Sequence, residues 1–333
     1  MSNNHTAGRR PVFVLVAVSL ILALAIAGVV AFKSASKLEI QFIVSGDVQY
    51  NLRDRDYEIW GAFLREACEQ NPTADFALLL GDMVENPAEE RDWEAFFENK
   101  QRAFGKLDVY PTPGNHETSI TQDIYLQKFG LPDNRPVTTN QGGTISSGEF
   151  YSFDYKDCHV LSLNSCFFMK ERLKAGSEEE YEADRAEINT WIEKDLANSE
   201  AAFKVVIMHH PMYPIAADDE IYERLRNNWE SIFNRYGVDL VLCGHQHAYA
   251  RTDAAEEGQV EGPVYVMVNS GQKRSKYLKE EAEIPEYIKA FREDVPVYLC
   301  VKLFSGEKKT KIKVEAVAPG GETVDSFEIV KEQ

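Results

Sequence analysis

The sequence has few cysteines and no excess of positive charge. Its five cysteines are scattered and none lies in a C-x-x-C pair, which argues against a structural zinc site or a disulfide framework. One disulfide, between Cys158 and Cys166, is allowed if the domain lies outside the cell. With 36 basic and 54 acidic residues, the formal net charge is −18, so we do not expect duplex nucleic acid to bind through a basic surface.

Charge is absent from one long stretch, residues 12–32, which reads VFVLVAVSLILALAIAGVVAF. A helix of about 20 such residues spans the hydrocarbon core of a bilayer. Arg9 and Arg10 precede the run, so we expect residues 1–11 to form a cytoplasmic arm and the rest of the chain to lie outside a cell membrane. The alternative is a cleaved signal peptide and a secreted domain, because residues 34–36 are small. The run exceeds the usual signal core of about 7–15 residues, which favours a single-pass anchor.

Apolar runs and helical periodicities alternate over residues 38–333, which are interpreted as one domain. Strands are predicted at 38–44, 75–80, 109–113, 159–164, 203–208, 238–242 and 264–268. Helices are predicted at 56–70, 89–104, 180–196 and 222–236, and alternating antiparallel strands within 295–330. This order indicates a layered α/β fold. Two polar segments, 132–149 and 273–294, are expected to be surface loops that could rim a site.

Five of the predicted strands end in turns that carry Asp, Asn or His. In open α/β sheets, ligands bind beyond the carboxyl ends of the strands. We therefore expect six side chains to converge: Asp47, Asp82, Asn115, His209, His245 and His247. Carboxylates and imidazoles suit divalent transition metals, and six such groups exceed the needs of one tetrahedral ion. The set predicts two ions that share a carboxylate and clamp the attacking and leaving oxygens of a displacement.

These turns, taken in order, resemble the calcineurin-like metallophosphoesterase family, whose pattern is D-x-H, G-D, G-N-H-(D/E), H and G-H-x-H. Here the pattern stands as Gly46–Gln49, Gly81-Asp82, Gly114–Glu117, His209 and Gly244–His247. The resemblance covers roughly residues 38–271 and is to the branches similar to purple acid phosphatases and cyclic-nucleotide phosphodiesterases. It implies a four-layer α/β/β/α sandwich of two mixed sheets.

The resemblance also implies a role for each matched residue. Asp82 would bridge the two ions, and Asp47 and His247 would bind the first. The second ion would be held by Asn115, His209 and His245. His116 would not bind metal but would lie over the substrate and stabilise or protonate the leaving group. A hydroxide between the ions would attack the phosphorus of a small phosphate ester, either a monoester or a diester.

Two positions depart from the family pattern. Gln49 stands where the family has His; its amide oxygen is a neutral, weaker ligand, so ligation by Gln49 would favour Mn or Fe over Zn. The alternative is that Gln49 contacts only substrate or water. Glu85 stands where purple acid phosphatases carry Tyr, so the purple iron site is not expected. Glu85 either orients His116 or begins a helix, and His210 either faces the substrate or packs in the interior.

A rival hypothesis from another class is a catalytically inert sensor that binds metal or a phosphate ester on the same fold. In such a protein, we would expect several of the family's ligand and catalytic residues to be replaced. Only Gln49 departs from the family's ligand set, so the sequence favours an active hydrolase that uses two divalent metal ions.

Overall fold

The computed structural model describes residues 37–49, 54–118, 122–129, 148–170, 177–216, 219–252, 262–274, 283–306 and 309–332. The membrane-spanning segment predicted at 12–32 and the arm before it lie outside these ranges and stay predictions. Within the described ranges, no helix is long and apolar enough to cross a bilayer.

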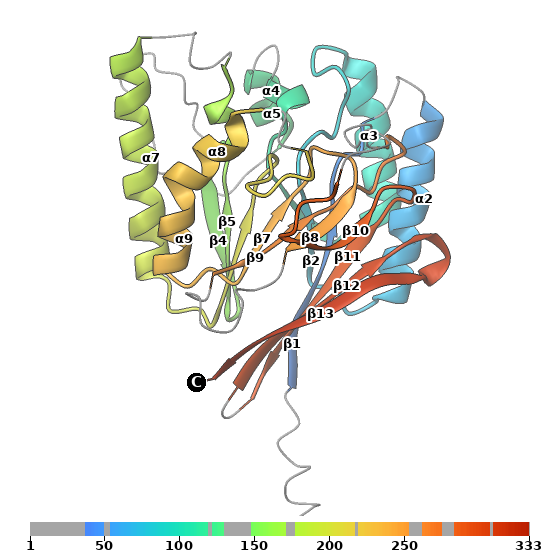
Figure 1. Cartoon of the computed structure of the whole chain (residues 1–333). Coiled ribbons are helices and arrows are strands. Elements are labelled where there is room, and N and C mark those ends of the chain that lie inside the picture. Colours follow the sequence, from blue (N-terminus) through green and yellow to red (C-terminus); the bar gives the residue numbers. More distant parts are fainter. Residues whose placement is uncertain are drawn as a thin grey trace, which may run out of the picture.

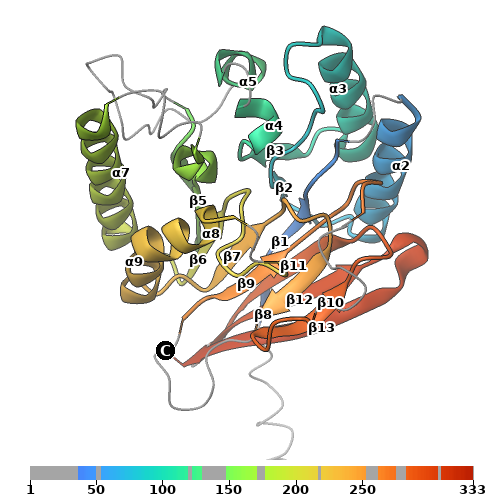
Figure 2. The same ribbon diagram turned by 45° about the horizontal axis from the view of Figure 1, so that its top comes forward.

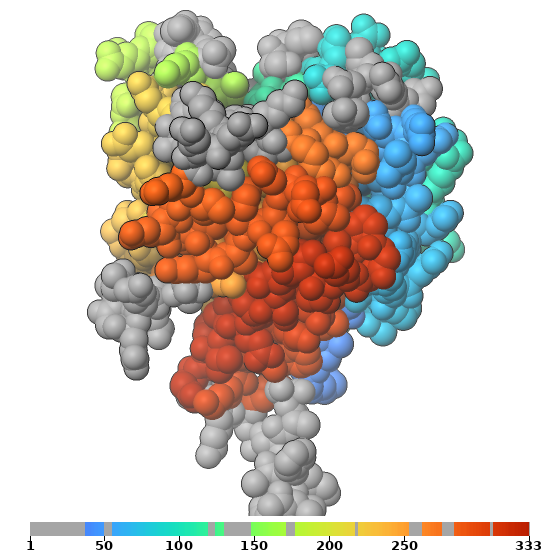
Figure 3. Space-filling model, turned by 45° about the vertical axis from the view of Figure 1, so that its right-hand side comes forward, coloured from blue at the N-terminus to red at the C-terminus, as the bar shows by residue number. Residues whose placement is uncertain are grey.

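Two mixed sheets form the centre of the domain (Figure 1). The first has the strand order β13-β12-β11-β1-β2-β3. Its strands are β1 (Lys37–Ser45), β2 (Phe76–Leu79), β3 (Asp108–Pro111), β11 (Tyr298–Ser305), β12 (Lys309–Val317) and β13 (Thr323–Glu332). Neighbours β1, β2 and β3 are parallel, whereas β11, β12 and β13 add antiparallel to the other side of β1. In Figure 3 the C-terminal residues, in red, occupy the lower part of the face in view.

The second sheet has the strand order β10-β8-β9-β7-β6-β5-β4. Its strands are β4 (Tyr151–Tyr155), β5 (Cys158–Ser162), β6 (Phe203–Ile207), β7 (Leu240–Cys243), β8 (Tyr249–Thr252), β9 (Val264–Met267) and β10 (Ile288–Arg292). The four strands β5, β6, β7 and β9 are parallel to one another. Their carboxyl ends therefore meet at one edge of the sheet. The sequence analysis predicts that the metal ligands lie in the turns at such strand ends.

Helices cover the outer faces of both sheets (Figures 1 and 2). The first sheet is covered by α2 (Asp54–Gln70) and α3 (Glu90–Phe104). The second is covered by α7 (Glu178–Asn198), α8 (Ile221–Leu225), a π-helical turn η2 (Arg226–Glu230) and α9 (Ser231–Arg235). Shorter elements are α4 (Asn115–Thr118), α5 (Gln122–Lys128), η1 (Ser165–Phe168) and η3 (Pro319–Gly321).

The layers follow from the alternation of side chains along the strands. In β1, Phe42 and Val44 pack in the core between the sheets, whereas Ile43 packs under α2 and α3. In β7, Leu242 faces the other sheet and Val241 faces the helices. Both faces of the parallel strands are thus buried, which explains why these strands read as continuous apolar runs.

The structure differs from the sequence expectations at several places, and it contains two strands, β4 and β8, where none was predicted. Residues 288–292, within a segment expected to be surface loop, form β10, an edge strand whose side chains are partly exposed and which therefore lacks an apolar run. The helix expected at 222–236 is interrupted by η2. All five cysteines are free, so the structure does not contain the Cys158–Cys166 disulfide that the sequence allowed; Cys158 lies between the sheets and Cys166 lies in η1.

His159 in β5 fastens the β4–β5 hairpin to α7. One ring nitrogen lies 2.8 Å from Asp154 Oδ1 and the other 2.8 Å from Asp195 Oδ2, and Asp195 also accepts a hydrogen bond from Ser152. Burial lowers the pKa of His159, but the hydrogen bonds to the two carboxylates outweigh burial and raise that pKa above its ordinary value of 6.5.

Folding therefore favours protonated His159. Its stabilisation is fully present below the pKa of the unfolded chain and is lost as the pH rises through the raised pKa of the folded state. We expect His159→Gln to lower the free energy of unfolding by about 1–2 kcal/mol near pH 6 and by less near pH 9. Urea unfolding of both proteins at the two pH values measures this, and an equal difference at both would contradict the assignment.

Candidate metal centre

The predicted ligands sit in strained turns directly after strands. Among the described non-glycine residues, the left-handed backbone region is occupied at five positions, and four of them are expected ligands: Asp47 (φ 52°), Asp82 (φ 50°), His245 (φ 78°) and His247 (φ 51°). Such a conformation costs of order 1–3 kcal/mol for each residue and persists only where the surroundings enforce it. Strain of this kind clusters at functional sites.

Two glycines allow the turns to approach one another. A Cβ on Gly114 would lie 2.2 Å from Asp82 Oδ1, and a Cβ on Gly244 would lie 2.6 Å from Asp47 Oδ2. Both distances are well inside van der Waals contact, so no side chain fits at either position. The glycines of the G-N-H-E and G-H-Q-H motifs thus admit the two carboxylates to the centre.

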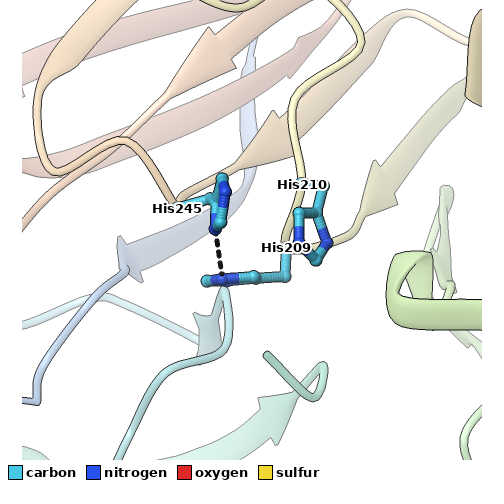
Figure 4. A group of neighbouring side chains, drawn as sticks. All are labelled: His209, His210 and His245. Atoms are coloured by element: carbon cyan, nitrogen blue, oxygen red, sulfur yellow. Dashed lines mark hydrogen bonds between the residues drawn. The ribbon is translucent and has the colours of Figure 1, made fainter. Parts of the chain in front are cut away.

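The residues expected at the second ion converge closely. Asn115 Oδ1 lies 2.9 Å from His209 Nε2 and 3.0 Å from His245 Nδ1. The two imidazole nitrogens are 3.2 Å apart, and Figure 4 shows the rings of His209 and His245 meeting at this point. Asp82 Oδ2 lies 3.3 Å from His209 Nε2. The other nitrogen of His209, Nδ1, donates to the Leu80 carbonyl at 2.8 Å, which leaves Nε2 directed at the centre.

The residues expected at the first ion also converge near Asp82. The Gln49 amide group lies 3.0 Å from Asp82 Oδ2 and 3.4 Å from His247 Nε2. His247 Nε2 is 4.0 Å from Asp47 Oδ1. Gln49 is fully buried, and its Oε1 has no hydrogen-bond partner among the described residues. A half-turn of the amide directs this oxygen at Asp82 and His247, so the donor set fits a cation.

Without a bound cation, the negative charge of the buried carboxylates is only partly balanced by the neighbouring histidines. Burial raises the pKa of Asp82, but His209 and His116 outweigh burial and hold it well below its ordinary value. Burial raises the pKa of Asp47 to about 7, despite the lowering effect of His209. Burial lowers the pKa of His209, yet Asp82 and Asp47 raise it to about 9. A protonated His209 therefore supplies positive charge that divalent ions would supply on binding.

The other histidines of the centre stay neutral, the form that binds metals. Burial and the neighbouring His209 lower the pKa of His245 to about 3. Burial, followed by the charge of Lys273, lowers the pKa of His247 to about 3. Two groups of ligand atoms, within 4.8 Å of one another, could each hold an ion: Asp47, Asp82 and His209, and His209, His210 and His245.

His116 lies beside this cluster and is partly exposed. Its Nδ1 donates to the Glu85 carbonyl at 2.8 Å, and its Nε2 lies 3.9 Å from Asp82 Oδ2. Burial lowers the pKa of His116, but Asp82 and then the Glu85 carbonyl outweigh burial and raise it. The carboxylate of Glu85 is 3.9 Å from the same ring. Since α3 begins only at Glu90, Glu85 does not start a helix, and it orients His116 mainly through its main chain.

His210 packs in the interior. Its Nδ1 lies 2.9 Å from Ser165 Oγ, and the same hydroxyl accepts the backbone N–H of His210 at 2.9 Å. The side chain is buried, with its ring centroid 4.3 Å from that of His245. Burial lowers its pKa well below the ordinary value. His210 therefore supports the ring of His245 from behind.

The sequence analysis assigned no role to Glu117 or Gln246. Glu117 is fully buried and accepts four backbone N–H groups at 2.8–3.1 Å, from Gly114 and from the Asp82 turn, residues 82–84. It therefore shapes the turn that presents the shared carboxylate. The acidic fourth position of G-N-H-E was visible in the sequence, but the burial that explains it was not.

Gln246 lies between the two ligands His245 and His247 and is also fully buried. Its Oε1 accepts the backbone N–H of Ile215 at 2.7 Å, and its Nε2 donates to the Ala216 carbonyl at 2.7 Å. It thus joins the G-H-Q-H turn to the segment that follows His209. Because the middle position of the motif varies in the family pattern, the sequence carried no signal for this contact.

The centre is a buried cluster of carboxylate, amide and imidazole groups at the strand ends of a two-sheet α/β sandwich. This arrangement is typical of metal-binding hydrolases. The family model for calcineurin-like phosphoesterase matches residues 40–249. The chain belongs to the calcineurin-like phosphoesterase family.

Known proteins with similar sequences include acid phosphatases. Purple acid phosphatase 15 of Arabidopsis thaliana is 29% identical over 204 residues, 58% of this chain and 34% of that protein. Acid phosphatase type 7 of Danio rerio is 25% identical over 296 residues, 78% of this chain and 62% of that protein. The chain thus spans about a third to three fifths of the length of these relatives.

A solved structure with the same fold is the purple acid phosphatase from yellow lupin seeds. It superposes with a TM-score of 0.63 at 17% identity, covering 89% of this chain and 54% of that one. At this identity the superposition shows the fold alone, while the matched family motifs carry the inference about the site.

The position of Glu117 makes a testable prediction. In Glu117→Gln, an amide nitrogen replaces one acceptor oxygen and faces backbone N–H groups instead of accepting from them. We expect the free energy of unfolding to fall by about 2–4 kcal/mol and manganese binding to weaken, because the Asp82 turn loses its support. Urea unfolding and metal content per chain measure the two effects. Unchanged stability would show that Glu117 does not hold the turn.

Proposed function

We propose that the protein hydrolyses phosphate esters with two divalent metal ions. The observation that carries this proposal is the placement of Asp82 Oδ2, 3.0 Å from the Gln49 amide and 3.3 Å from His209 Nε2. One carboxylate oxygen thus faces both ligand groups, which supports Asp82 as the bridging ligand. The family membership and the similarity to acid phosphatases support the same reaction class.

The first ion would be held by Asp47, Gln49, Asp82 and His247, and the second by Asp82, Asn115, His209 and His245. Bound divalent ions of this kind neutralise phosphoryl oxygens and lower the pKa of the water that attacks phosphorus. A neutral amide at Gln49, in place of an imidazole, favours manganese or iron over zinc at the first position.

His116 is the residue proposed to protonate the leaving group. The Glu85 carbonyl fixes its tautomer, because only a protonated Nδ1 donates to a carbonyl oxygen, and this directs Nε2 toward the metal ligands. Burial lowers the pKa of His116, but Asp82 and the Glu85 carbonyl raise it above its ordinary value, which favours the protonated ring that a proton donor needs. Its partial exposure leaves room for a substrate, whereas the ligands behind it are buried.

The proposal is tested by a paired hydrolysis assay. The protein is stripped with a chelator, reloaded with Mn²⁺, and given a chromogenic phosphomonoester and the matching phosphodiester. We expect turnover that depends on metal and falls at least about 10³-fold in Asp82→Asn, because the shared ligand is lost. Asp108→Asn, at the opposite end of β3, is the matched control and is expected to keep full activity.

The faster substrate identifies the enzyme as a phosphomonoesterase or a phosphodiesterase. Absence of turnover on both substrates, with two metal ions shown to be bound, would contradict the proposal and favour the inert sensor on the same fold.

The role of His116 makes a separate prediction. His116→Ala removes the proton donor but keeps the backbone N–H that Asp82 accepts at 3.0 Å. We expect kcat to fall by about 10²–10⁴-fold while both metal ions stay bound. Metal analysis of the purified variant beside its kinetics separates the two effects. A variant that loses its metal would show that His116 is a ligand.

A further inference from the structure

The turn after β9, residues 269–274, is built against the first-ion ligands. The buried amide of Asn269 donates to the His247 carbonyl at 3.2 Å and to the Lys273 carbonyl at 2.7 Å. On the other side, Ser270 N–H donates to the Gly46 carbonyl at 2.8 Å. A Cβ on Gly271 would lie 2.0 Å from the Asp47 carbonyl oxygen. The turn is therefore fixed to both neighbouring strand ends.

The same turn carries a positively charged side chain, Lys273. Lys273 is half-buried and lies in the turn that Asn269 and Gly271 hold against the His247 and Asp47 carbonyls. Burial has the larger effect on the pKa of Asp47 and of His247, and the positive charge of Lys273 lowers both. Lys273 forms no ion pair with any carboxylate in the described part of the chain. The guanidinium of the next residue, Arg274, donates back to the Gly271 carbonyl at 2.7 Å and to the Lys273 carbonyl at 3.1 Å, which closes the turn.

The position of this charge bears on which substrates the centre prefers. A phosphomonoester carries a charge between about −1.5 and −2 at neutral pH, since its second pKa is near 6, whereas a diester carries a single negative charge. A cation beside the metal ligands attracts the more highly charged ester more strongly. In a chain with a net charge of −18, an ammonium that pairs with no carboxylate of the described residues is available to such an anion.

We propose that Lys273 is a specificity-determining residue that binds the dianionic phosphoryl group of a phosphomonoester beside the first ion. This inference rests on the proposed function and extends it, because it assigns the centre to monoesters over diesters. The sequence analysis placed Lys273 in a surface loop that could rim a site. Asn269 and Gly271 hold the start of this segment against the His247 and Asp47 carbonyls.

The kinetic test compares three variants on the paired substrates. In Lys273→Met, we expect kcat/KM for the monoester to fall about tenfold and that for the diester to change less than about twofold. Lys273→Arg keeps the charge and is expected to keep most of the monoester preference. Lys106→Met removes the same charge before β3, at the edge of the sheet away from the site, and is expected to change neither. Equal losses on both substrates in Lys273→Met, or no loss, would overturn the proposal.

A binding measurement separates this inference from the proposed function. Inorganic phosphate, a small dianion, is titrated into the manganese-loaded protein and into Lys273→Met and Lys106→Met. We expect about tenfold weaker binding in Lys273→Met only, with a difference that shrinks at high ionic strength. Equal affinity in all three proteins overturns the role of Lys273. Weaker phosphate binding in Lys273→Met, from a wild type that turns over neither ester, supports the role of Lys273 and refutes only the hydrolytic function.

Discussion

Burial of two carboxylates, Asp47 and Asp82, is the constraint on which the rest of the centre depends. Both are almost completely inaccessible to solvent, and an ionised carboxylate in the interior requires positive charge or hydrogen-bond donors. Asp82 obtains both, from His209 and from the backbone N–H of His116. Asp47 accepts the backbone N–H of His245 at 2.8 Å, yet its pKa stays raised to about 7. Positive charge is therefore lacking between Asp47 and Asp82, where the remaining ligands converge.

The two sheets solve the problem of bringing these groups together. Parallel strands end at a common edge, so each short turn after a strand places one ligand beside the next. The backbone strain in these turns is held by buried polar contacts: Glu117 holds the Asp82 turn, Gln246 joins the His245 turn to the segment after His209, and Asn269 joins the His247 turn to Lys273. The ligands are thus fixed by residues that would not themselves touch an ion.

Much of the fold and most of the ligand set could be predicted from the sequence, for physical reasons. Strands that are buried on both faces appear in the sequence as apolar runs. A Gly-Asp or Gly-His turn after such a run marks the edge of the sheet that carries the ligands. An edge strand such as β10 leaves no such run, because its side chains are partly exposed. The role of Glu117 could not be read either, since an acidic residue in a motif looks the same whether it is solvated or buried under four N–H donors.

The sequence by itself determined the family, the order of the strands that end in ligands, and the substitution of an amide at Gln49, since these depend on local pattern and residue type. The tertiary structure decided how the groups are shared. Only folding places one oxygen of Asp82 between Gln49 and His209, turns His210 into the interior against Ser165, and holds the turn of residues 269–274 against the Asp47 carbonyl. Such contacts join residues far apart in the sequence, and proximity at that range is created by the packing of the sheets rather than by any local preference.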